Sequence, residues 1–293
     1  GSVDHHLTRI VNFNYLYPNS PYSAVYVPQD DVNSTFNALI LSLRRNFAQG
    51  VQVAANYKWS KSIDTLSYGG PGAVTNQTWP QDQSTERGPS DFDATHFFTL
   101  TGLWDLPIYR NQQGALGAIL GGWELNGILT FHSGFPWTPK IGQSIQTPGG
   151  PSLAPTRPSV YYGGALYDTS NSAFINGTNF PACEGAVAQP ACGAQYFNIA
   201  TGGPPGIGRN VFRGPRFYQI DMSFVKRTKL PWLHLGEAAS LELQGNFYNI
   251  FNQLNLTPLG FYSTGTFADQ GFLGRADGAL IGRVVDLQAR FVF

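Results

Sequence analysis

The sequence predicts an all-β protein whose strands form an antiparallel transmembrane β-barrel. Two observations carry this prediction: eight segments alternate between apolar and polar residues, and the connections between them alternate between long and short. Successive side chains of a strand point to opposite faces, so alternation creates one apolar and one polar face. In a transmembrane barrel, the apolar face contacts lipid and the polar face lines the interior.

The last segment, 282–293, shows the alternation most clearly. One face carries Val285, Leu287, Ala289, Phe291 and Phe293, and the other carries Val284, Asp286, Gln288, Arg290 and Val292. A chain end usually frays unless it is held in place, so a strand that runs to the last residue is unusual for a soluble sandwich. It is typical of a bacterial outer-membrane barrel. We therefore treat Phe291 and Phe293 as a candidate C-terminal signal for the barrel-assembly machinery.

Seven further segments show the same period of two. They are residues 7–16, 34–47, 51–62, 94–106, 122–133, 217–230 and 239–250. Counting back from the C-terminus, the connections before these strands are long, short, long, modest, long, tight and long again. Outer-membrane barrels have short periplasmic turns and long external loops. With Phe293 on the periplasmic side, every long connection falls outside.

The composition agrees with a barrel and argues against other classes. Charged residues make up 12% of the chain, aromatic residues 14%, and the formal net charge is zero. A neutral chain lacks the basic surface that nucleic-acid binding needs. No apolar run approaches the roughly 20 residues of a membrane-spanning helix.

The two cysteines, Cys183 and Cys192, lie close together in the longest connection. A local disulfide in an oxidising compartment is the preferred interpretation, with free thiols as the alternative. No metal site and no cofactor are expected, because no histidine neighbours the cysteines and adjacent His5 and His6 would face opposite ways on a strand.

Several stretches resemble TonB-dependent outer-membrane receptors of the Oar-like subgroup, in the C-terminal part of their barrel. The stretches are Ser34–Leu39, Lys58–Asp64, Ser90–His96, Gly121–Gly127, Gly208–Pro215, Asn246–Asn252 and the terminal strand. The resemblance spans nearly the whole chain, and the motifs occur in the family's order. Asp93-Ala94-Thr95-His96 departs from the family's usual basic pair before the histidine, so His96 receives no specific role.

The resemblance implies a larger barrel of about 22 strands, of which these eight form the closing third. Residues 1–293 are then a C-terminal barrel fragment without signal peptide, plug domain or carboxypeptidase-regulatory-like domain. The implied protein imports a bulky solute across the Gram-negative outer membrane and is energised by TonB through the absent plug. The expected partners are outer-membrane lipid, the assembly machinery, TonB and an unidentified solute.

Polar residues on the inward side of the strands are the candidate functional residues. They are Arg44, Lys58, Glu124, His132, Asp221, Glu242, Gln244, Asp286 and Arg290. One interpretation is internal pairing and contact with a plug. The other is a polar wall along which a plug shifts or a solute passes.

No catalytic motif is found, and the chain is not expected to be an enzyme. His132 and Ser133 are adjacent but face opposite ways, so they cannot form a nucleophile–base pair. Three alternatives remain open: a small eight-stranded barrel that acts as an adhesin or structural protein, a passive channel, and an outer-membrane lipase. Eight strands alone leave an interior only wide enough for side chains.

Overall fold

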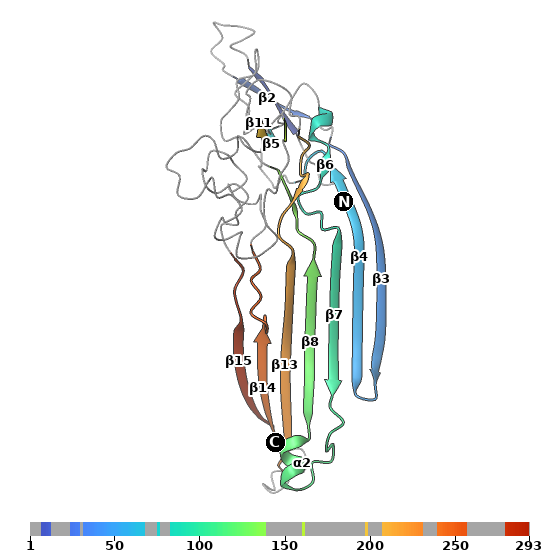
Figure 1. Cartoon of the computed structure of the whole chain (residues 1–293), viewed down its shortest axis with the longest axis vertical. Coiled ribbons are helices and arrows are strands. Elements are labelled where there is room, and N and C mark those ends of the chain that lie inside the picture. The colour runs from blue at the N-terminus through green and yellow to red at the C-terminus, as the bar shows by residue number, and fades with distance from the viewer. Residues whose placement is uncertain are drawn as a thin grey trace, which may run out of the picture.

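The computed structural model describes residues 7–12, 24–29, 32–67, 75–76, 83–138, 160–161, 197–198, 207–230, 239–256 and 279–292. Its main body is one antiparallel sheet of eight strands (Figure 1). Seven are long and lie side by side in the order β15-β14-β13-β8-β7-β4-β3, and β6 pairs with β4. The all-β, antiparallel fold predicted from the sequence is confirmed.

The long strands match seven of the eight predicted segments to within a few residues. Their bounds are β3 Ser34–Ala48, β4 Val51–Asp64, β7 His96–Asp105, β8 Trp123–His132, β13 Phe217–Lys229, β14 Ser240–Tyr248 and β15 Val284–Val292. Phe293 lies outside the described residues, as do Cys183 and Cys192.

The first predicted strand does not join this sheet, so that part of the prediction is wrong. β1 (Leu7–Asn12) pairs instead with β2 (Ala24–Gln29) and β5 (Thr75–Asn76) in a separate three-stranded sheet. The eighth strand of the main sheet is β6, which comprises only Gly88–Pro89. Alternation alone identifies a strand but not its partner, because a period of two suits any half-buried sheet.

The remaining elements are short. They are the 3-10 turn η1 Gln83–Glu86, the helix α2 Gly114–Leu120, and the two-residue strands β9 Pro136–Trp137, β10 Val160–Tyr161, β11 Phe197–Asn198 and β12 Phe212–Arg213. Neither helical element of the described part of the chain has the length and apolar character to cross a membrane.

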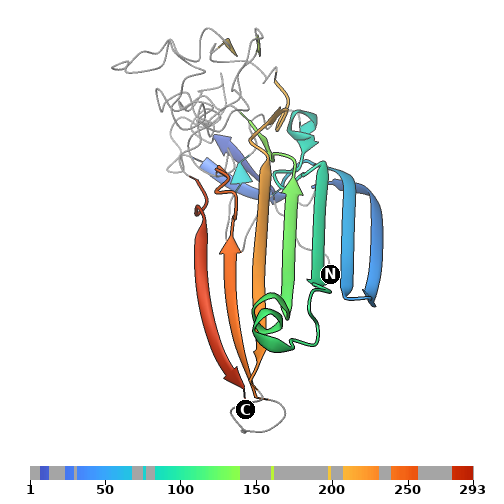
Figure 2. The same cartoon turned by 60° about the horizontal axis from the view of Figure 1, so that its bottom comes forward.

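One end of the sheet, here called the short-turn end, carries the β3–β4 turn, α2 and the paired strand ends at Lys229 of β13 and Ser240 of β14 (Figures 1 and 2). The β3–β4 turn consists of Gln49 and Gly50, both with positive φ, at 55° and 81°. Two residues of positive φ form the type I′ turn that matches the twist of a hairpin. A side chain at Gly50 would also meet the carbonyl oxygen of Asp105 at 2.8 Å, so glycine fits this turn. The opposite end is called the loop end.

The strand register gives the sheet one apolar and one polar face, because residues directly opposite each other share a face. In one row, Ala55 lies opposite Leu100, Leu100 opposite Leu129, and Leu129 opposite Ile220. Leu39 and Leu243, on different parts of the apolar face, expose 49% and 46% of their surfaces. The apolar face is therefore open, and these leucines do not form a buried core together.

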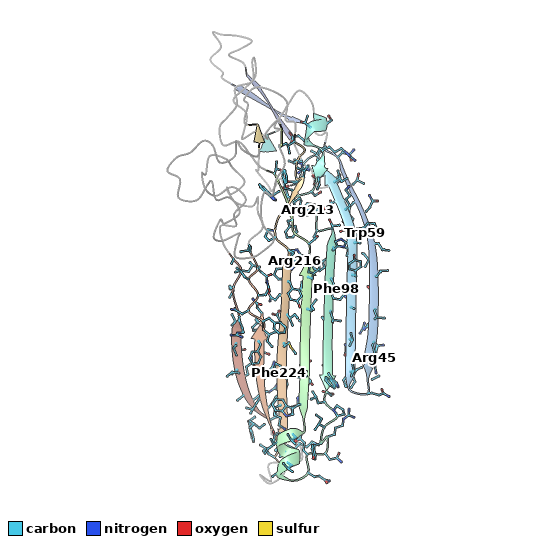
Figure 3. The ribbon with its side chains drawn as sticks, in the orientation of Figure 1. Arg45, Trp59, Phe98, Arg213, Arg216 and Phe224 are labelled. Atoms are coloured by element: carbon cyan, nitrogen blue, oxygen red, sulfur yellow. The ribbon has the colours of Figure 1, made fainter. Side chains whose placement is uncertain are left out.

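Tryptophans mark both margins of the apolar face. Trp59 lies toward the loop end of β4, as Figure 3 shows, and Trp104 lies opposite Val51 at the short-turn end. The eight steps from Val51 to Trp59 along β4 measure about 26 Å at about 3.3 Å per residue. The apolar band of an outer-membrane barrel is about 25 Å tall. The spacing of the tryptophans thus fits the two interfacial girdles of a membrane barrel.

The sheet is open between β3 and β15, which are its two edge strands (Figure 2). Near its end, β3 contains an irregularity: Arg45 lies opposite Val53, but the next paired residue is Ala48, opposite Val51. Two residues of β3 therefore face one residue of β4, which is a β-bulge.

Candidate functional site

The polar face of the sheet is the candidate functional site. The register places all nine predicted polar residues on this face, distributed over six of the seven long strands: Arg44, Lys58, Glu124, His132, Asp221, Glu242, Gln244, Asp286 and Arg290. They form a wall rather than one compact site. Arg44 and Arg290 lie on opposite edge strands, so the structure does not bring these two together.

In the middle of this wall, side chains form hydrogen bonds with one another, both within one strand and between neighbouring strands. Gln244 donates to Asn246 at 2.8 Å and to Ser223 at 3.2 Å. Asp286 accepts from Gln288 at 2.8 Å and from Asn246 at 3.4 Å. The wall therefore offers amide and carboxylate groups to water or to a polar surface, and most of its charges are already hydrogen-bonded.

An aromatic row crosses the polar face near the loop end. The His132 ring stacks on Phe217, with centroids 5.0 Å apart, and on Phe97 at 6.0 Å. The ammonium of Lys58 lies 5.5 Å from the centroid of Phe97. His132 Nδ1 contacts the backbone oxygen of Ser133 at 2.9 Å, so the ring acts there as a donor. His132 is therefore packed between the two phenylalanine rings.

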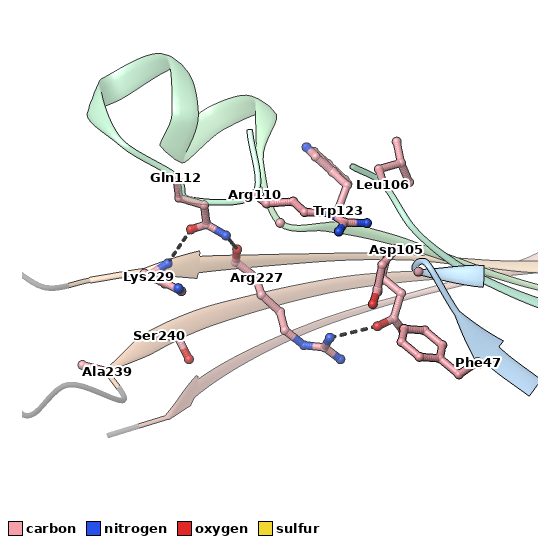
Figure 4. Close-up of a pocket in the computed structure, with 13 residues that line it drawn as sticks. Phe47, Asp105, Leu106, Arg110, Gln112, Trp123, Arg227, Lys229, Ala239 and Ser240 are labelled. Carbon is pink, nitrogen blue, oxygen red and sulfur yellow. Dashed lines mark hydrogen bonds and ion pairs between the residues drawn. The ribbon is translucent and has the colours of Figure 1, made fainter. Parts of the chain in front are cut away.

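Arg227 joins two of the predicted carboxylates at the short-turn end. Its Nη1 lies 2.9 Å from Glu124 Oε2 on β8 (Figure 4). Its Nε lies 2.7 Å from Glu242 Oε2 on β14. Arg227 and Glu124, with Asp105, Arg110 and Gln112, line a cavity of about 600 Å³. Arg227 is not among the predicted residues, although alternation after Asp221 and Ser223 places it on the polar face.

A second charged group, here called the loop-end cluster, consists of Asp64, Asp91, Asp93, Arg209 and Arg213. Arg209 forms an ion pair with Asp64, and its Nη1 donates to Ser67 at 2.9 Å while its Nε donates to the Glu86 carbonyl at 2.8 Å. Arg213 pairs with Asp93, whose other oxygen accepts a 2.7 Å hydrogen bond from the Ser62 amide. These contacts hold the β4–β7 and β8–β13 connections together at the loop end.

Asn210 links the same segments from the centre of the cluster. Its side chain donates to the Pro89 carbonyl at 2.9 Å and to Asp91, and it accepts from Thr138 at 2.8 Å. Nearby, Trp137 and Phe212 lie opposite each other in the β9–β12 pair, with ring centroids 5.7 Å apart. Two stretches singled out in the sequence, Ser90–His96 and Gly208–Pro215, thus meet in space. The sequence motifs identify both stretches but do not indicate which of their charged residues pair.

Lys226 is a second residue that the sequence analysis missed. It follows Phe224 on the apolar face of β13, opposite Trp123 and Leu243. Its ammonium donates to the carbonyls of Ala118, at 2.7 Å, and Gly121 at the C-terminal end of α2. Lys226 could have been identified from the sequence, because it is a charged residue at a position where the alternation predicts an apolar one.

Within the described residues, no group of three or more His, Cys, Asp and Glu side chains is arranged to hold a metal ion.

Comparison with known proteins places this geometry in a family. The protein-family model of the outer membrane β-barrel domain matches residues 1–278 of the sequence. The chain belongs to the outer membrane β-barrel domain family and is a protein of the Gram-negative outer membrane. Barrels of this family are typically non-enzymatic. No curated protein matches the chain.

Among solved structures, the chain is similar to FpvA of P. aeruginosa, which was determined bound to heterologous pyoverdines as an iron complex. The alignment has 10% sequence identity and a TM-score of 0.42, and it covers 98% of this chain. The chain spans 23% of the length of that FpvA chain.

Proposed function

We propose that residues 1–293 form the C-terminal part of the barrel of a TonB-dependent, Oar-like transporter that imports a bulky solute. The observation that carries the proposal is the open sheet with one apolar and one polar face. The six spacings from β15 to β3, at about 4.8 Å each, put the edge strands about 29 Å apart along the sheet. In this proposal, further strands close the barrel around this polar face.

The size of the barrel separates the proposal from its rivals. If the sheet closed on itself, side chains such as Arg227 and Gln244 would fill the interior, because an eight-stranded barrel has room for little else. A larger barrel leaves these groups facing a lumen or a plug domain. The motif resemblance supports the larger barrel and the plug.

In this function the chain does no covalent chemistry and requires no cofactor. The apolar face contacts outer-membrane lipid, the polar face contacts the plug or passing solute, and the loops recognise the solute outside. In this proposal, TonB acts through a plug domain. Phe291 and Phe293 are the proposed signal for the barrel-assembly machinery.

Barrel size is tested with the full-length parent protein in the outer membrane. Ser42→Cys on β3 and Gln288→Cys on β15 place one thiol on each edge strand, with both side chains on the polar face. We expect no disulfide between these positions after oxidation, because other strands separate the edges. Efficient cross-linking within one chain would identify a small closed barrel and contradict the proposal.

Transport is tested by uptake of labelled oligosaccharides, peptides and ferric chelates that exceed the porin size limit. We expect uptake of at least one solute class to fall both when the parent gene is deleted and when TonB is depleted. Uptake that needs the gene but not TonB would identify a passive channel. Uptake that is unchanged by deletion would favour an adhesin or structural role.

A further inference from the structure

The helix α2 exposes its apolar side and buries its glycine side. Leu116, Ile119 and Leu120 expose 66%, 64% and 44% of their surfaces, whereas Gly117 and Gly121 are buried. A surface helix of a water-soluble domain has the opposite arrangement, with its apolar side toward the core. The exposed side of α2 therefore needs an apolar environment outside the described residues.

The glycines explain why α2 has this orientation. A side chain at Gly121 would lie 2.2 Å from the Tyr109 carbonyl oxygen, and one at Gly117 would lie 2.8 Å from the Gln112 carbonyl carbon. Only glycine permits this close packing of the helix against its own loop. The larger side chains consequently point away.

The loop that carries α2 is attached to β13 by Gln112. The Gln112 side chain donates to the Arg227 carbonyl at 2.8 Å and accepts from the Lys229 amide at 2.9 Å. These two bonds occupy backbone groups at the end of the strand (Figure 4). The apolar side of α2 is thus displayed by a fixed loop.

Two residues of the apolar face hold α2 on that side of the sheet. The Trp123 indole N–H donates to the Ile119 carbonyl at 3.1 Å, and the Lys226 ammonium donates to the Ala118 and Gly121 carbonyls. In Figure 4, the Trp123 side chain and the helix lie on one side of the strands, and the Arg227 side chain lies on the other. The exposed side of α2 is therefore continuous with the lipid-facing side of the sheet.

We propose that α2 is an interfacial helix that inserts Leu116, Ile119 and Leu120 into the phospholipid leaflet at the short-turn end of the barrel. Short turns lie on the periplasmic side of outer-membrane barrels, so this leaflet is the inner one. Trp123 lies where an interfacial aromatic residue is expected. The Lys226 ammonium group, on the lipid-facing side, donates its hydrogen bonds to carbonyls at the C-terminal end of α2.

The experiment uses the full-length parent protein in vesicles of phosphatidylethanolamine and phosphatidylglycerol. An environment-sensitive fluorophore is attached to Leu116→Cys or Ile119→Cys, with Cys183 and Cys192 replaced by serine. The matched control is Asn111→Cys, an exposed position of the same loop. Heat-modifiable electrophoretic mobility verifies that each labelled barrel is folded.

We expect blue-shifted emission and strong quenching by brominated phospholipids at positions 116 and 119. At position 111 we expect stronger quenching by aqueous acrylamide. If acrylamide quenches all three positions alike and bromolipid quenches none, the helix lies in water and the proposal is wrong. If both quenchers fail at positions 116 and 119, protein covers the helix, which also overturns the proposal.

Discussion

Arg213 and Asp93 are 120 positions apart in the sequence, yet their side chains form an ion pair 2.5 Å long at the loop end of the sheet. Asp93 is almost fully buried, whereas 35% of the Arg213 side chain is exposed. The pair joins two stretches that the sequence analysis had singled out separately. It fixes the base of the longest loop next to the start of β7.

Asp93→Asn is expected to loosen the loop-end cluster. The substitution removes the charge that Arg213 meets and weakens the hydrogen bond from the Ser62 amide. Because Arg213 remains partly hydrated, we expect local opening to become easier by about 1–2 kcal/mol. Amide hydrogen exchange of Gly214, which bonds the Phe135 carbonyl, should then accelerate roughly 5–30-fold.

The control for this experiment is Asp91→Asn, since half of the Asp91 side chain is exposed. A smaller acceleration is expected there. Unchanged exchange in the Asp93 variant would mean that the Arg213–Asp93 pair does not hold the segment.

Leu100→Arg is expected to impair barrel assembly much more than Thr101→Arg. The two residues are neighbours on β7 and face opposite ways, with Leu100 in the middle of the apolar face. An arginine on the lipid face costs about 2–4 kcal/mol near the bilayer midplane, whereas the polar face tolerates charge. The fraction of heat-modifiable, folded protein in the outer membrane measures the difference. Equal assembly of the two variants would show that the assigned facing is incorrect.

Arg227→Gln is expected to destabilise the barrel by about 0.5–1 kcal/mol at low salt, because it leaves Glu124 and Glu242 without their shared cation. Over half of the Arg227 side chain is exposed, so the penalty stays small. In about 1 M salt, the Debye length of about 3 Å screens the carboxylates, and the penalty should shrink. Urea unfolding in lipid vesicles at both salt concentrations tests this expectation.

Arg44→Gln serves as the control for Arg227→Gln, since Arg44 is an exposed residue of the edge strand β3 and lies opposite Ala54. A penalty for Arg227→Gln that does not depend on salt would argue against an electrostatic role for this residue.

Lys226→Met is expected to release α2 without unfolding the sheet. The variant removes the donor to the Ala118 and Gly121 carbonyls but keeps an apolar stem beside Trp123. The unfolding free energy should change by less than about 1 kcal/mol, because the lost hydrogen bonds are offset by removal of a charge from the lipid face. Amides of residues 114–121 should exchange faster. Lys229→Met is the control, and equal exchange in both variants would contradict the role of Lys226.

The strands and their faces were predictable because alternation is a local property of the sequence. Seven long strands and the common face of Glu124, Glu242 and Gln244 follow from that pattern alone. The partner of the first strand was not predictable, since pairing depends on distant residues. The helix α2 was missed because its seven residues, Gly-rich and uncapped by a side chain, resemble a loop.

The charged groups were predictable only in part, for the same reason. Alternation indicates to which face of the sheet Asp221 or Arg227 points. It does not indicate with which of several carboxylates an arginine forms an ion pair. Arg209 contacts Asp64 across 145 positions of sequence. Contacts of this kind depend on how loops from different hairpins converge.

The bulge in β3 has a consequence for the strand that would join this edge in a complete barrel. The extra residue between Arg45 and Ala48 changes the stagger of β3 relative to β4. Stagger summed around a barrel is its shear, and shear together with strand number sets the tilt of the strands and the diameter of the barrel. One inserted residue near the end of β3 therefore contributes to the width of the whole barrel.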